Sequence, residues 1–236
     1  MDDKVLSWLL DAETPTIRYL TLVDLMGLPK EDERAQEARR AIMRQGPVTN
    51  ILAAQKEEVN WPGEHSFYTP KYRSTHWSLM LLAELLADGT DARLRRGAEF
   101  MLDATAARLE ERLERGDASL SCFYGNMLRY VCQAGLASDD RTAPVVAYCL
   151  RTLYDGPCRC DWNSDLACAW GAARALWGLA ALPAELRGPE VERAIEQGLE
   201  FLLAPGRLPA AEYPVPDGGK VHSIWSRLNF PLFYQV

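Results

Sequence analysis

The sequence lacks any apolar run that approaches the roughly 18 residues of a membrane-spanning helix. A signal peptide is not expected either, because the opening segment M-D-D-K-V-L-S-W-L-L-D is acidic and its apolar part is too short. We therefore expect no membrane span and a cytoplasmic location. In that compartment thiols stay reduced, so clustered cysteines more often bind a metal or take part in catalysis than form disulfides.

A basic patch is absent too. The chain has 33 acidic and 26 basic side chains, for a formal net charge of −7. Binding to nucleic acid needs enough clustered Lys and Arg to neutralise several phosphates, so we expect no nucleic-acid partner. A length of 236 residues with 48% hydrophobic residues is typical of a soluble protein with a sizeable core, and a single domain is expected over residues 1–236.

Alternating, strand-like runs are missing as well, and the predicted class is all-α. Apolar residues recur every three or four positions, which is typical of helices with a buried face. Ser74, Asp139 and Ser164 stand where N-caps are expected, and Gly89 and Gly135 stand where helices should end. The segments with this periodicity are 15–27, 74–88, 91–115, 122–136, 139–154, 164–182 and 189–204.

An internal repeat becomes visible when these helices are paired. Pairs begin near residues 75, 121 and 167, and a weaker copy begins near Pro15. In each pair the first helix is apolar nearly all round, whereas the second has a charged face. Such pairs bury their apolar faces by stacking, and this asymmetry favours two concentric layers of helices, an α/α toroid around a central cavity.

Several segments resemble the terpenoid cyclase and protein prenyltransferase superfamily, and within it the bacterial prenyltransferase or squalene-oxidase repeat proteins. They are Y-T-P-K-Y-R-S-T-H-W-S-L-M-L-L-A-E-L (68–85), C-F-Y-G-N-M-L-R (122–129), A-W-G-A-A-R-A-L-W-G-L-A-A-L-P (169–183), R-L-N-F-P-L-F-Y-Q (227–235) and Q-K-E-E-V-N-W (55–61). The resemblance covers most of the chain and implies the toroid scaffold. These segments define a scaffold and not a reaction.

The sequence departs from that family in two places. Class II cyclases carry a D-x-D-D acid motif at the start of an inner helix, whereas this chain has Asp165 alone, in N-S-D-L-A. Asp165 is the candidate catalytic acid, and the alternative is that its carboxylate stabilises a helix N-terminus. The chain also stops at F-P-L-F-Y-Q-V, where relatives continue with further helix pairs. An incomplete ring with missing C-terminal repeats and a ring closed by a second subunit in a homodimer both stay open.

Histidine is scarce, with three residues in the chain, yet one histidine shares a repeat position with two cysteines. His76, Cys122 and Cys168 are spaced 46 residues apart, in the first turn of three successive inner helices. His222 is a candidate fourth member after a longer insertion. Because inner helices of a toroid all begin at the same end, these side chains should form an arc around one rim.

Two further cysteines belong to the loop that leads to this rim, namely Cys158 and Cys160. Zinc takes four Cys or His ligands, and helix N-termini stabilise the thiolate that binds it. The sequence therefore predicts a zinc site. Four cysteine ligands would make it structural, and three ligands with an open position would allow chemistry. The alternative is that the repeated position is set by packing volume, which is the interpretation preferred for Cys132 and Cys149.

Aromatic side chains flank the same position: Trp77, Tyr124, Trp170 and Trp225. In the cyclases that the chain resembles, such rings line the cavity and stabilise carbocations through their π faces. The equally weighted alternative is that they fill the core of a narrow toroid.

Two functions are consistent with these patterns. The first is a zinc-binding, terpenoid cyclase-like or prenyltransferase-like protein whose aromatic cavity takes an apolar, isoprenoid-like small molecule. The second is a non-catalytic toroid, a binding or scaffold protein with a structural zinc. The sequence contains no complete catalytic constellation, so whether the chain is an enzyme stays open at this point.

Overall fold

The computed structural model describes residues 2–56, 61, 66–117, 119–154, 159–160 and 166–204, with backbone only at 159–160 and 166–167. The chain divides into two compact units, Met1–Leu94 and Arg95–Val236.

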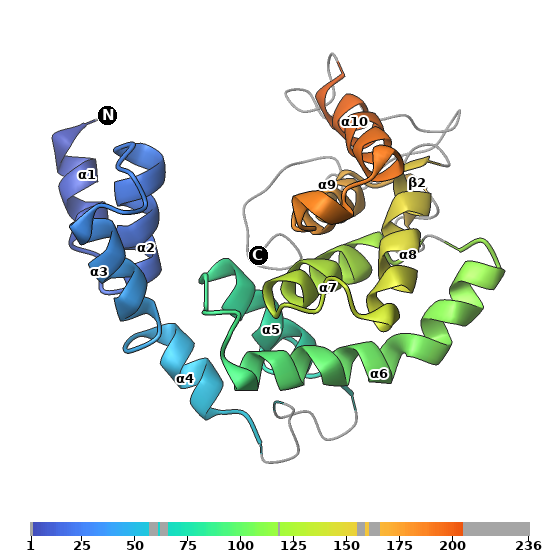
Figure 1. Cartoon of the computed structure of the whole chain (residues 1–236), viewed down its shortest axis with the longest axis horizontal. Helices are drawn as coiled ribbons and strands as arrows, with labels where there is room; N and C mark the ends of the chain where they lie inside the picture. The colour runs from blue at the N-terminus through green and yellow to red at the C-terminus, as the bar shows by residue number, and fades with distance from the viewer. Residues whose placement is uncertain are drawn as a thin grey trace. The chain divides into compact units, whose positions relative to one another are not determined.

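The first unit contains five α-helices and a π-helical turn among its described residues: α1 (Asp3–Leu10), α2 (Pro15–Leu20), η1 (Thr21–Leu25), α3 (Glu33–Ile42), α4 (Pro47–Ala53) and α5 (Thr75–Glu84) (Figure 1). The N-caps of α1 and α3 are Asp2 and Asp32, whose carboxylates accept hydrogen bonds from backbone N–H groups of the first turn. Pro15 and Pro47 begin α2 and α4, where the missing N–H costs nothing.

The end of α5 differs from the sequence-based expectation. The sequence places the stop at Gly89, but the helix ends at Glu84, and Leu86 adopts the left-handed conformation with φ of 57°. The backbone N–H of Leu86 donates to Ala83 and that of Ala87 to Leu82, which is the Schellman arrangement usually built on glycine.

Two side chains from elsewhere in this unit hold the end of α5. The hydroxyl of Thr16 donates to the carbonyl oxygen of Leu85 at 2.6 Å, and Arg39 donates to that of Leu86. These bonds satisfy carbonyl groups that a helix end leaves without intrahelical partners. The tertiary contacts thus stabilise a leucine in a conformation that it rarely adopts.

The second unit contains most of α6 (Ala92–Glu114) and the four helices that follow. These are α7 (Ser121–Gln133), α8 (Ala143–Tyr154, preceded by the 3₁₀ turn η2, Asp140–Thr142), α9 (Ala169–Ala180) and α10 (Pro189–Leu203, preceded by the 3₁₀ turn η4, Ala184–Leu186). A two-residue antiparallel ladder, β1 (Arg159–Cys160) with β2 (Leu166–Ala167), precedes α9. The all-α class is confirmed.

Helices α7 to α10 form two layers. Helix α7 packs on α9, and α8 and α10 pack on α9 and on each other. Most residues of α7 and α9 are buried, whereas α10 buries only Val191, Ala194, Gly198 and Leu202, along one face. This contrast in burial is what we expect of inner and outer helices, and their arrangement as a toroid stays a prediction. None of the described helices is long and apolar enough to cross a membrane.

Candidate functional site

The predicted zinc ligands within the described residues occupy helix starts. His76 and Cys122 are the second residues of α5 and α7, and Cys168 is the N-cap of α9. The backbone of Cys160 belongs to β1, and its side chain is not described. The remaining predicted residues lie outside the described part of the chain: Cys158, Asp165, His222 and Trp225.

The prediction of a zinc site is wrong for the part of the chain that the structure describes. No group of three or more His, Cys, Asp and Glu side chains among those residues could hold a metal ion. The physical reason is that two of these side chains make other contacts at the start of their helices, namely Cys168 as a cap and His76 in the core. The Sγ atom of Cys168 accepts a hydrogen bond from the N–H of Gly171 at 3.3 Å, so this cysteine caps α9.

His76 fills a core position. Its side chain is 1% exposed, and its ring lies 5.7 Å from that of Tyr68 and 6.0 Å from that of Trp77, measured between centroids. Burial lowers the pKa of His76 to about 3, because the charged imidazolium would lose its hydration there. The ring is therefore neutral at pH 7.

The predicted cavity aromatics are buried as well. The indole N–H of Trp77 donates to the carbonyl oxygen of Tyr68 at 3.0 Å. The ring of Tyr124 lies 4.5 Å from that of Tyr148, a residue of α8, and Trp170 is 4% exposed. At least Trp77 and Tyr124 thus pack against neighbouring rings of the protein, which is the core-filling role.

Tyr148 also stabilises the start of α7. Its hydroxyl oxygen accepts a hydrogen bond from the N–H of Leu120, the N-cap of that helix, at 2.8 Å. Next to it the hydroxyl of Ser121 donates to that of Thr152 at 3.2 Å. Helix α8 therefore supplies the capping group that the sequence around α7 does not provide.

Two cavities lie between helices of the described parts. One, of about 520 Å³, lies between α1, α2 and α3 in the first unit and is lined by charged side chains, among them Arg18, Glu33 and Glu37. The other, of about 210 Å³, lies between α6 and α8. Neither is lined by Trp77 or Tyr124, and neither corresponds to the expected aromatic cavity.

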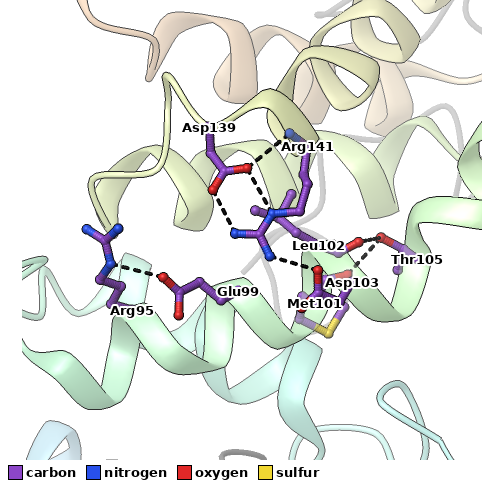
Figure 2. A network of polar contacts seen from close by, with 8 residues as sticks. All are labelled: Arg95, Glu99, Met101, Leu102, Asp103, Thr105, Asp139 and Arg141. Carbon is purple, nitrogen blue, oxygen red and sulfur yellow. Dashed lines mark hydrogen bonds and ion pairs between the residues drawn. The ribbon is translucent and has the colours of Figure 1, made fainter.

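An ion-pair network borders the smaller cavity (Figure 2). The guanidinium of Arg141 binds both carboxylate oxygens of Asp139 at 2.7 and 2.8 Å and donates to Asp103 of α6 at 2.7 Å. The hydrogen bonds from Arg141 lower the pKa of Asp139 to about 2. Because Asp139 is also the N-cap of η2, the network fixes the start of α8 on α6 and is structural.

Helices α7 and α9 cross at two glycines. A Cβ atom on Gly125 would lie 2.3 Å from the carbonyl oxygen of Arg174, and one on Gly178 would lie 2.6 Å from that of Gly125. Real Cβ atoms do not approach backbone atoms so closely, so only glycine permits this distance between the helices. This close approach fixes the positions of the neighbouring side chains on both helices.

Beside the crossing, two arginines lie against a single tryptophan. The Cζ atom of Arg129, from α7, lies 3.6 Å from the ring centroid of Trp177, and that of Arg174 lies 4.5 Å from the same centroid. Arg174 is 4% exposed, whereas Trp177 is 37% exposed although it belongs to an otherwise buried helix. We call these three residues the Arg–Trp–Arg cluster.

The cluster concentrates positive charge. The two Cζ atoms are no more than about 8 Å apart, and two unit charges at that distance repel by roughly 2 kcal/mol at an effective dielectric constant near 20. Each guanidinium gains about 0.5–2 kcal/mol from the face of the indole, so the ring offsets much of this repulsion. Neither α7 nor α9 contains an acidic residue, in a chain with 33 of them.

This cluster was not predicted from the sequence. The signal was present, because Arg174 is the single charged residue of the α9 segment A-W-G-A-A-R-A-L-W-G-L-A, and a charge in an apolar helix needs a reason. The pairing with Arg129 was not visible, since it depends on how α7 and α9 cross.

Comparison of the chain with protein-family models, with curated proteins and with solved structures gave no match. The resemblance to terpenoid cyclases and prenyltransferases gains no support from these comparisons and stays a prediction.

Proposed function

We propose that the chain is a non-catalytic binding protein of the helical-repeat, α/α-toroid type, and that it holds an apolar, isoprenoid-like small molecule against Trp177. The observation that carries the proposal is the 37% exposure of this indole on a helix whose other large side chains are buried. Tryptophan and arginine are the residue types most enriched where proteins bind partners. The exposed part of the indole, held in place by two guanidiniums, offers a rigid apolar contact.

The toroid part of the proposal is supported by the two layers that α7 to α10 form. Inner helices apolar nearly all round and outer helices with one charged face are what a ring of helix pairs requires. A cytoplasmic location, a compartment in which thiols stay reduced, is proposed with it.

The direct test is calorimetric titration of the protein with farnesol, an uncharged isoprenoid alcohol. We expect saturable binding, weakened about tenfold or more in Trp177→Ala, because truncating a central aromatic contact typically has such an effect. Trp8→Ala is the matched control, since Trp8 is 72% exposed on α1 and should be unaffected.

Three outcomes would overturn the proposal. The first is a wild-type protein that does not bind farnesol, and the second is equal binding of farnesol by Trp177→Ala. The third is release of a cyclised or transferred product when the protein is incubated with polyprenyl diphosphates, which would make the chain an enzyme.

A further inference from the structure

We infer that the cavity between α1, α2 and α3 binds a small monocarboxylate with an apolar chain, and that Arg18 of α2 binds its carboxylate group. The cavity has a volume of about 520 Å³ and is lined by residues of the first unit alone. Volumes of roughly 300–1,000 Å³ are typical of sites for small molecules. The inference goes beyond the proposed function, because Trp177 belongs to the second unit and does not line this cavity.

The guanidinium of Arg18 lacks a partner. This residue is half-buried, and its Nε atom is buried without a hydrogen-bond acceptor among the described residues. In that part of the chain no carboxylate lies within ion-pair distance of it. The other two arginines of the lining have carboxylate partners: Arg34 binds Asp32 at 3.1 Å. Arg40 binds Glu37 at 2.8 Å. A buried donor without an acceptor costs stability, and a bound carboxylate would supply the acceptor.

The most buried part of the lining is apolar. Leu22, Ala38 and Ala41 line the cavity and are buried, and the half-buried Leu10 joins them from the end of α1. Residues three apart on a helix are neighbours on its surface, so Ala38 and Ala41 share one side of α3. Their short side chains leave room that a larger apolar residue would fill. An apolar chain bound there would lose contact with water, which favours binding.

The exposed part of the lining favours a carboxylate over a phosphate. It includes the carboxylates of Glu33 and Glu37, which repel an anion with two charges more strongly than an anion with one. Glu33 stands in the first turn of α3, where the helix dipole stabilises its charge, so it needs no cationic ligand. The planar fork of N–H donors on Arg18 matches the two oxygens of a carboxylate and cannot lose its charge.

The test is calorimetric titration of the full-length protein with sodium octanoate at constant ionic strength, and saturable binding is expected. Octanol has a similar chain without the charge and acetate has the charge without the chain, so each should bind more weakly by about tenfold or more. Arg18→Met should weaken octanoate binding about tenfold or more, because it removes the charged donor and keeps an apolar side chain. Ala38→Leu should weaken it too, by filling the cavity. Arg193→Met, at an exposed residue of α10, makes the same change of net charge as Arg18→Met and should have no effect.

Absence of saturable octanoate binding to the wild type would overturn the inference, as would equal binding by the Arg18 and Arg193 variants. Octanol or acetate binding as tightly as octanoate would overturn it too, and this comparison does not depend on the folding of any variant. Tighter binding of octyl phosphate would refute the choice of a carboxylate. Trp177→Ala should leave octanoate binding unchanged, and a loss in that variant would refute the cavity as the site. Farnesol binding tests the proposed function by itself, so the two can fail separately.

Discussion

Replacing Gly125 by alanine should force the two inner helices apart. The added Cβ would lie 2.3 Å from the carbonyl oxygen of Arg174, 2.4 Å from its carbonyl carbon and 2.6 Å from the amide nitrogen of Ala175. All three are backbone atoms in the middle of α9 and cannot rotate away. The contact can therefore be relieved only by moving a helix, which disturbs the packing on both of its sides.

The size of the effect follows from two opposing contributions. Alanine is about 1 kcal/mol more favourable than glycine inside a helix. Overpacking of a core typically costs about 1–3 kcal/mol, and a clash with rigid backbone belongs at or above the upper end of that range. We expect a net loss of about 2 kcal/mol in the free energy of unfolding, which corresponds to roughly 4–8 °C in Tm for a chain of this length.

Urea unfolding followed by far-UV circular dichroism measures this loss. Gly198→Ala is the matched control within a helix, because its Cβ would meet only side-chain atoms of Leu176 and Leu153, the nearest at 2.8 Å, and these can shift. Gly188→Ala is the control without a clash, since nothing lies within 4 Å of its added Cβ. Gly125→Ala as stable as the wild type, or more stable than Gly198→Ala, would refute the described crossing.

Two further predictions concern stability. Tyr148→Phe removes the hydroxyl that accepts the hydrogen bond from the N–H of Leu120, so the free energy of unfolding measured in urea should fall by about 1–2 kcal/mol. Tyr154→Phe is the control and should lose less, because the hydroxyl of Tyr154 donates its hydrogen bond on an exposed surface. An equal loss in both variants would contradict the capping role of Tyr148. For His76, the pKa of about 3 in the fold lies below the ordinary value of 6.5, so the unfolded chain binds more protons between these values and stability should decrease as the pH falls from 6.5 towards 3. The variant His76→Gln should show a flatter dependence of the urea midpoint on pH over that interval, and an unchanged slope would show that His76 is not buried neutral.

The helices in the second half of the chain were predictable because their signals are local. The long periodic segments correspond to α6, α7, α8 and α10, and Asp139 caps its turn as expected. Gly135 ends α7 with φ of 73°, as a glycine after a helix should. Such signals depend on residues within one or two helical turns of each other, so they can be recognised from the sequence alone.

Helix boundaries and one whole helix were predicted less well where the local signal is weak. Helix α9 begins at Ala169 with Cys168 as its N-cap, four residues after the N-cap expected at 164. Helix α3 was not among the periodic segments, because its buried face is made mainly of small alanines, Ala35, Ala38 and Ala41. Alanine is a weak marker of a core face, although it allows close packing.

The predicted zinc site shows most clearly that repeat spacing alone does not determine side-chain contacts. A repeat spacing of 46 residues placed His76, Cys122 and Cys168 at equivalent positions of successive helices, and the structure places all three at helix starts. Equivalent positions, however, do not fix what a side chain contacts. His76 lies among aromatic rings and Cys168 caps its own helix, so spacing alone overstated the case for a metal.

The sequence by itself determined that this protein is all-α and that apolar helices alternate with amphipathic ones. Both properties follow from hydrophobic periodicity and local capping, which act along the chain. Only the tertiary structure decided that Gly125 meets the backbone of α9, that Leu86 takes a left-handed conformation, and that Arg129 and Arg174 share one indole. These features depend on contacts between helices, and a contact between residues 45 positions apart leaves no periodic trace in a single sequence.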